Sequence, residues 1–165
     1  MKIKFSSGLC WLWITFIVLL LDRVTKYAAQ KYLLAYYALP VIPGFNLMLS
    51  FNRGAAFSFL SSESGWQVWF FGLIAFVVSI GILCWLARLS SRERWVSIAL
   101  SFIIGGALGN LFDRAYHGFV VDFIDFYVGD WHFATFNIAD CAICIGAALI
   151  VLEGFLSPSG KPAKN

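Results

Sequence analysis

Charged residues and histidine are scarce in this sequence. Only 13% of its 165 residues are Asp, Glu, Lys or Arg, 61% are hydrophobic, and the mean hydropathy is +0.81. This composition excludes an ordinary soluble domain. The two histidines, His117 and His132, occur in no H-E-x-x-H motif, which argues against a zinc peptidase. Neither a G-x-S-x-G serine elbow nor a standard phosphate-binding glycine loop is present.

Four hydrophobic runs approach or reach the length of about 20 residues that a helix needs to cross a bilayer. We expect membrane spans at about 9–32, 67–88, 95–113 and 134–154. The 7 tryptophans lie near the ends of these spans, as in the aromatic belts of membrane proteins. The sequence therefore predicts a mainly α, integral membrane protein: one membrane domain, residues 1–165, with four transmembrane helices.

Lysine and arginine indicate the orientation of these spans. Both termini and the connection between the second and third spans fall on one side of the membrane, and that side is rich in cations in short segments. By the positive-inside rule, both termini are cytoplasmic. This bias also accounts for the net charge of +3, so we expect no nucleic-acid partner. The bulky residues and Asp22-Arg23 after the first apolar run argue for an uncleaved first span rather than a removed signal peptide.

Two connections on the outer side, about 33–65 and 114–131, are long enough to form structure of their own. Within 45–52, apolar residues occupy every second position, which is typical of a half-buried strand. The segment 120–126 is apolar except for Asp122 and Asp125, and Gly118 and Gly129 bracket it. We expect a small extracytoplasmic β-sheet on the outer membrane surface, and a disordered tail at 157–165.

The 4 cysteines all lie within the expected spans. Cys141 and Cys144 are three residues apart and so share a helical face, but no histidine lies near them in the sequence. We interpret all four as small buried apolar residues. The sequence predicts no metal site and no disulfide framework.

Two of the spans carry polar residues at helical spacing. Asp22 and Lys26 lie four apart at the end of the first span, in the favourable order for an ion pair. As an interfacial salt bridge this pair would close the helix end, and a role in fixing the outer loops is compatible with that. In the third span, Gly106, Asn110 and Arg114 form a stripe on one face. Either this stripe lines a cavity, or Asn110 makes a structural hydrogen bond between helices and Arg114 snorkels to the interface. Gly105 and Gly109 form a small-xxx-small packing face on the same helix.

Asp122 and Asp140 are the strongest candidates for a functional site. Carboxylates at membrane depth are costly and mark functional sites by default. Two neighbouring carboxyl groups cannot both ionise cheaply, so one can act as base and the other as acid in peptide hydrolysis. Asp140 could instead cap its helix after Asn137, and Asp125 is a competing partner for Asp122. A small transporter or proton-relay subunit remains the alternative function.

Five motifs, in order along nearly the whole chain, resemble those of bacterial lipoprotein signal peptidases (signal peptidase II). They are D-x-x-T-K at 22–26, N-x-G-A-A-F at 52–57, G-G-A-x-G-N-x-x-D-R at 105–114, V-x-D-F at 120–123 and F-N-x-A-D at 136–140. The resemblance implies an intramembrane aspartic endopeptidase of the bacterial inner membrane. It implies removal of the signal peptide from diacylglyceryl-modified prolipoproteins, with cleavage just before the lipidated cysteine.

The resemblance also implies roles for individual residues. Asp122 and Asp140 match the catalytic dyad, near the outer leaflet. Five further positions match residues that support the dyad or contact substrate: Asn52, Gly54, Asn110, Arg114 and Asn137. We expect structural roles for Asp22, Lys26 and Gly106. The resemblance implies no metal or other cofactor, inhibition by globomycin-type cyclic peptides and contact with membrane lipids. We expect a monomer.

Overall fold

The computed structural model describes residues 7–54, 65–90 and 92–156. This part of the chain contains four long helices: α1 (Leu12–Tyr32, preceded by the 3-10 turn η1, Gly8–Trp11), α2 (Trp66–Arg88), α3 (Arg94–His117) and α4 (Ile138–Leu156). Each is long and apolar enough to cross a membrane, as the sequence predicts. Because so many of their large apolar side chains face outward, the bundle needs an apolar solvent around it.

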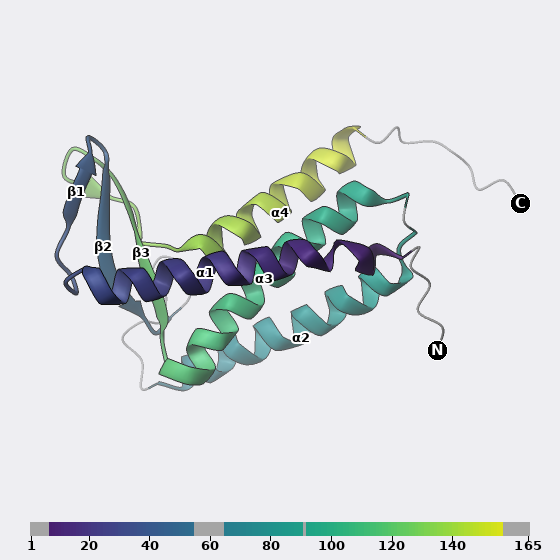
Figure 1. Ribbon diagram of the computed structural model, residues 1–165, viewed down its shortest axis with the longest axis horizontal. Helices are drawn as coiled ribbons and strands as arrows, with labels where there is room; N and C mark the ends of the chain where they lie inside the picture. The colour runs from purple at the N-terminus through teal and green to yellow at the C-terminus, as the bar shows by residue number, and fades with distance from the viewer. Residues whose placement is uncertain (1–6, 55–64, 91, 157–165) are drawn as a thin grey trace, which may run out of the picture.

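Helix α3 lies at the centre of the bundle and contacts the other three helices (Figure 1). Its glycines permit this. A Cβ at Gly105 would lie 2.7 Å from the Cβ of Val18 on α1, and one at Gly106 would collide with the backbone oxygen of Ala139 on α4. The expected close-packing face of this helix is thus confirmed, and Gly106 serves the same purpose towards α4.

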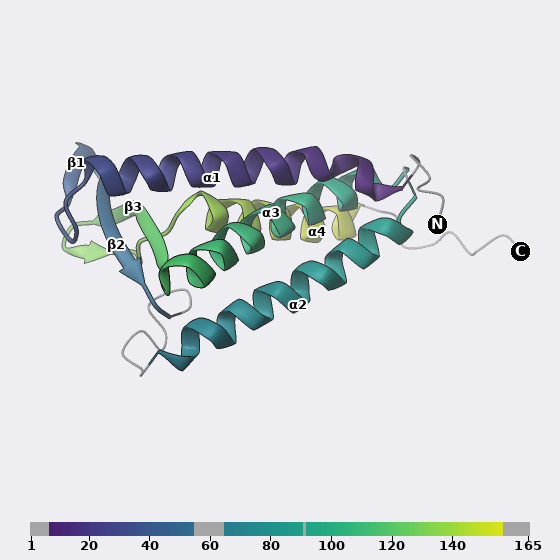
Figure 2. The same ribbon diagram turned by 60° about the horizontal axis from the view of Figure 1, so that its bottom comes forward.

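Helix α2 is arranged differently from the rest. Figure 2 shows it diverging from α1, α3 and α4 towards the end of the bundle that carries the sheet. Few of its residues are buried, whereas α3 buries more than any other helix. Most of the α2 surface is therefore available to lipid or to another apolar partner.

A four-stranded antiparallel sheet, in the order β1-β2-β3-β4, lies at one end of the bundle (Figure 1). Its strands are β1 (Leu39–Ile42), β2 (Phe45–Asn52), β3 (Val120–Val128) and β4 (Trp131–His132). The predicted strand at 45–52 is confirmed. It pairs with β3, which places Ser50 opposite Asp122. A core of Ala29, Leu49, Val121 and Phe123 packs the sheet onto the last turns of α1.

Two of the helices have bounds that differ from the spans expected from the sequence. Helix α3 continues to His117 rather than ending at 113, and Gly118, with φ +75°, ends it in the left-handed conformation that glycine adopts readily. Helix α4 begins at Ile138 rather than at 134, because the preceding residues pair with β3 through the bridge between Ile124 and Phe136. The tail at 157–165, expected to be disordered, lies outside the described residues.

The interpretation of the cysteines as buried residues is wrong. Cys10, Cys84 and Cys144 are exposed and Cys141 is half-buried. Most helix positions in this bundle face outward, so a position within a span is not thereby an interior position. All four cysteines are free thiols.

Candidate active site

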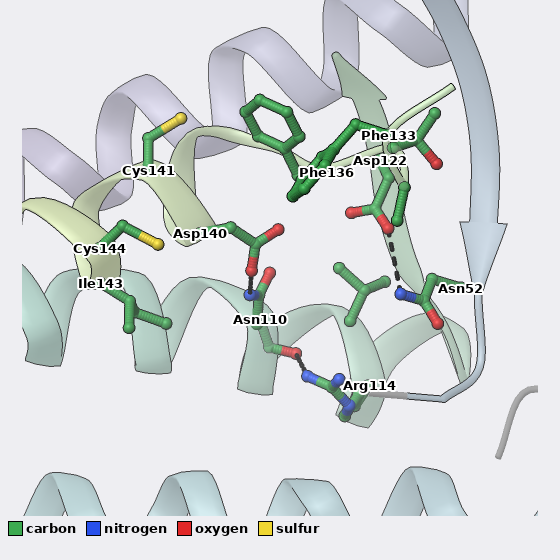
Figure 3. A pocket seen from close by; sticks show the side chains of 13 residues that line it. Asn52, Asn110, Arg114, Asp122, Phe133, Phe136, Asp140, Cys141, Ile143 and Cys144 are labelled. Atoms are coloured by element: carbon green, nitrogen blue, oxygen red, sulfur yellow. Dashed lines mark hydrogen bonds between the residues drawn. The ribbon is translucent and has the colours of Figure 1, made fainter. Parts of the chain in front are cut away.

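A cavity of about 470 Å³ lies where α3, α4 and the sheet meet. Both candidate aspartates line it, together with Asn52, Asn110 and Arg114. Figure 3 shows the carboxyl groups of Asp122 and Asp140 directed into the same space from different elements. The rest of the wall is largely apolar: Val120, Phe133, Ala134, Thr135, Phe136, Cys141, Ile143 and Cys144. Five charged or amide side chains therefore converge in a largely apolar pocket, as in many binding sites.

Asp122 lies on β3 and its side chain is 2% exposed. Its Oδ1 accepts a hydrogen bond from Asn137 Nδ2 at 2.6 Å, and its Oδ2 accepts one from Asn52 Nδ2 at 3.2 Å. Burial, and next the negative charge of Asp140, raise the pKa of Asp122 to about 7, against the opposing effect of these hydrogen bonds. Asp122 can therefore hold a proton near neutral pH.

Asp140 lies in the first turn of α4, where the helix dipole favours a carboxylate. Its Oδ1 accepts a hydrogen bond from Asn110 Nδ2 at 2.8 Å. Its Oδ2 accepts one from the backbone N–H of Asn137 at 3.2 Å, while Asn137 Oδ1 accepts one from the N–H of Asp140 at 3.0 Å. These two reciprocal bonds form a capping box. Asp140 thus both caps its helix, as one sequence interpretation proposed, and lines the cavity.

A cluster of four charged residues joins α1 to α3; three of them, Asp22, Lys26 and Asp113, are buried, and Arg23 is half-buried. Arg23 forms ion pairs with Asp22 at 2.7 Å and with Asp113 at 2.6 Å. Lys26 forms ion pairs with the same two aspartates, at 3.0 Å to Asp22 and 2.8 Å to Asp113. The expected pair between Asp22 and Lys26 is therefore formed. With two cations and two anions the cluster is neutral, which limits the cost of burying it. Asp113 Oδ2 also accepts a hydrogen bond from the backbone N–H of Val121. Asp22 Oδ1 accepts a hydrogen bond from the backbone N–H of Ala139.

The cluster thereby fixes the positions of the two candidate aspartates. Val121 directly precedes Asp122, and Ala139 directly precedes Asp140. Gly109 makes room for the cluster, because a Cβ there would lie 2.8 Å from Asp22 Oδ2. Three helices and β3 are thus joined at one point by charged hydrogen bonds.

The cavity wall continues through Arg114, near the end of α3. One guanidinium nitrogen donates to the backbone oxygen of Gly54 at 3.0 Å, and another donates to that of Asn110 at 3.3 Å. Gly54 N–H in turn donates to Asn52 Oδ1 at 2.9 Å. Arg114 therefore holds the end of β2, and with it Asn52, beside Asp122.

Comparison with known proteins identifies the family of this chain. Residues 14–156 match the family model described as "Signal peptidase (SPase) II". The chain belongs to the signal peptidase II family. It is therefore a peptidase of a membrane-enzyme family, and the sequence resemblance is confirmed.

Relatives at high identity share this assignment. The chain is 54% identical over 159 residues to the lipoprotein signal peptidase of Photorhabdus laumondii, covering 96% of this chain and 95% of that protein. It is 55% identical over 164 residues to the enzyme of the same name from Serratia proteamaculans, covering 97% and 95%. A solved structure described as a bacterial membrane enzyme superposes with a TM-score of 0.81 at 32% identity, covering 94% of this chain and 93% of that one.

Asp125, the competing partner for Asp122, is not brought into the cavity. Its Oδ2 accepts a hydrogen bond from Asn46 at 2.8 Å, and His132 Nδ1 lies 2.9 Å from its Oδ1. Because Asp122 and Asp125 are three positions apart on β3, they face opposite sides of the strand. Among the candidate pairs, the structure therefore brings Asp122 together with Asp140.

Sequence reasoning missed two members of the signal peptidase II site region. Asp113 and Arg23 lie within the matched motifs, but no role followed from their spacing. The available signal was the presence of an acidic residue inside a span, which requires a cationic partner at membrane depth.

For metals, the described residues contain no group of three His, Cys, Asp or Glu side chains that could hold an ion.

Proposed function

We propose that this chain is an aspartic endopeptidase in which Asp122 and Asp140 form the catalytic dyad. The observation that carries this proposal is the convergence of both carboxyl groups on one largely apolar cavity. The raised pKa of Asp122, about 7, supports a division of roles in which one carboxyl is protonated while the other is ionised.

The reaction follows from this division. The ionised carboxylate removes a proton from a water molecule, and that water attacks the carbonyl carbon of the scissile peptide bond. The protonated carboxyl donates a hydrogen bond to the carbonyl oxygen as negative charge develops there. Collapse of the tetrahedral intermediate breaks the C–N bond, and the leaving nitrogen receives a proton from the dyad. We assign Asn52, Asn110 and Asn137 to holding the carboxyl groups, and Arg114 and Gly54 to shaping the cavity near substrate.

The substrate we propose is a prolipoprotein that carries a diacylglyceryl-modified cysteine, cleaved just before that cysteine. The relatives' name, lipoprotein signal peptidase, supports this assignment. The apolar wall of the cavity suits an apolar signal peptide, and membrane lipids surround the bundle. A globomycin-type cyclic peptide would compete for the same cavity.

We further propose that the protein lies in the bacterial inner membrane as a monomer, with both termini in the cytoplasm. In this orientation the sheet end of the bundle, with the cavity, is at the outer leaflet. The cation-rich connection between α2 and α3 then faces the cytoplasm, as the positive-inside rule requires. The family assignment does not support the alternative of a transporter or proton-relay subunit.

The test is cleavage of a diacylglyceryl-modified prolipoprotein by the purified protein, by Asp122→Asn and by Asp140→Asn. An amide has nearly the same shape as a carboxyl but cannot exchange the proton, so we expect each variant to lose about 1,000-fold or more in kcat. The unlipidated prolipoprotein serves as the substrate control. The proposal fails if either folded variant turns over normally, or if the wild-type protein does not distinguish the two substrates.

A further inference from the structure

The amide groups of the three asparagines around the dyad each have one possible orientation. Asn52 Oδ1 accepts from the N–H of Gly54, and Asn137 Oδ1 accepts from the N–H of Asp140. Since an N–H can only donate, the NH2 group of each asparagine must point the other way, towards Asp122. Both amides are thus fixed by backbone groups.

Asn110 is fixed by a charged group together with a neutral one, because its Oδ1 accepts from the ammonium of Lys26 and also, at 3.2 Å, from Asn137 Nδ2. Its Oδ1 lies 3.0 Å from the ammonium nitrogen of Lys26, so its NH2 group is directed to Asp140 Oδ1. Lys26 is 2% exposed, and its three N–H groups have three acceptors: Asp22 Oδ1, Asp113 Oδ2 and Asn110 Oδ1. With every proton in use, the ammonium group has no alternative hydrogen bond to adopt.

The two carboxyl groups of the dyad are therefore held in unequal settings. Asp140 receives a hydrogen bond that a cation polarises, lies at the N-terminus of α4 and accepts the N–H of Asn137. Asp122 receives hydrogen bonds from two neutral amides, on a strand with no comparable dipole. Its pKa, raised to about 7, agrees with a carboxyl that retains its proton.

We propose that Lys26 is a positioning residue for the peptidase reaction: acting through Asn110, it holds Asp140 as the carboxylate that activates water and leaves the proton on Asp122. This inference rests on the proposed dyad and assigns the two roles within it. The charged groups that face Asp140 agree with it. Lys26 approaches from α1 by way of Asn110, and Arg114 lies on α3 in the same cavity wall. The acidic group opposite is Asp122 itself, and the thiols of Cys141 and Cys144 on α4 line the same cavity.

The test is the pH dependence of kcat/KM. In a dyad whose two settings differ, the acid limb reports mainly the group that is ionised at rest, and the alkaline limb reports the group that holds the proton. Lys26→Met removes the ammonium but keeps the length of the side chain. We expect it to move the acid limb to higher pH by about one unit. We also expect kcat to fall while KM stays within about twofold.

Two matched variants show which carboxyl group each asparagine serves. Asn110→Ala removes the donor to Asp140 and keeps the ion pairs of Lys26, so it should move the acid limb as Lys26→Met does. Asn52→Ala removes a donor to Asp122 and should move the alkaline limb to higher pH instead. The double variant Lys26→Met/Asn110→Ala should shift the acid limb no further than the larger single shift, because both changes interrupt one path.

Arg23→Met is the control for a merely structural role. Arg23 pairs with the same two aspartates as Lys26, but it makes no hydrogen bond to Asn110. It should lower the melting temperature and leave both limbs in place.

The inference is overturned if folded Lys26→Met leaves the acid limb in place, or if Asn110→Ala moves the alkaline limb or neither limb. Asn110→Ala decides the matter alone if Lys26→Met does not fold. The dyad variants separate the two proposals. If Asp122→Asn or Asp140→Asn still cleaves, the proposed function fails. If both are inactive and the acid limb stays in place in Asn110→Ala, only the role of Lys26 fails.

Discussion

The sheet end of this bundle holds two pairs of aspartates, Asp22 with Asp113 and Asp122 with Asp140, and the two pairs have different kinds of partner. Asp22 and Asp113 are held by the cations Arg23 and Lys26. Asp122 and Asp140 are held by the amide groups of asparagines and by one backbone N–H, with no ion pair of their own among the described residues.

The difference separates structure from chemistry. A buried carboxylate paired with a cation stays ionised, so it can anchor helices but cannot exchange a proton during a reaction. A buried carboxyl held by neutral amides keeps both protonation states within reach, because an amide hydrogen bond favours the ionised form less than a full charge does. The cation-held pair thus builds the frame, and the amide-held pair is available for catalysis.

The largest expected effect on stability comes from breaking the cation-held pair. Asp113→Asn leaves the cluster with two cations and one anion and weakens the link to Val121 N–H. We expect a loss of about 3–5 kcal/mol in the free energy of unfolding, as for other buried ion pairs that lose one partner. Thermal unfolding in lipid or detergent measures it. Asp130→Asn, at an exposed position after β3, is the matched control and should leave the melting temperature unchanged.

A second prediction concerns the effect of pH on the amide-held pair. Because the pKa of Asp122 is raised to about 7 in the folded protein, the folded state binds an extra proton at pH values between about 4 and 7. Stability from this group is complete below about pH 4 and is lost as the pH rises through 7. We expect Asp122→Asn to show a smaller fall in melting temperature between pH 4 and pH 8 than the wild-type protein. Equal falls in the two proteins would contradict the raised pKa.

The smallest expected effect is at Asp125, which shares a strand with Asp122 but not its setting. Asp125→Asn keeps an acceptor for Asn46 and changes only the contact with His132, on the side of β3 away from the cavity. We expect kcat to stay within about threefold of the wild-type value, with at most a modest loss of stability. A large loss of turnover in a folded variant would mean that the two sides of the strand are not independent.

The sequence could predict much of this arrangement, because membrane depth makes polar residues conspicuous. The four spans and the strand at 45–52 follow from hydropathy and period, and the cost of intramembrane charge draws attention to Asp122 and Asp140. Helical spacing likewise predicts the pair between Asp22 and Lys26.

The rest depends on contacts between distant segments. The bonds from Asp113 to Val121 and from Lys26 to Asn110 join elements far apart in the chain, and no periodicity encodes them. The start of α4 does not follow from hydropathy, because a bridge to β3 overrides the apolar pattern at 134–137. The exposure of the cysteines does not follow from hydropathy either. Hydropathy marks a span but does not separate its lipid-facing positions from its buried ones.

The most direct test of the dyad compares one substitution on the two sides of β3. Asp122→Asn and Asp125→Asn would be purified together, checked for folding by thermal unfolding, and assayed for single-turnover cleavage of a diacylglyceryl-modified prolipoprotein. We predict that both fold, that Asp125→Asn cleaves at close to the wild-type rate, and that Asp122→Asn does not cleave. Cleavage by folded Asp122→Asn at a rate near that of the wild type would contradict the account.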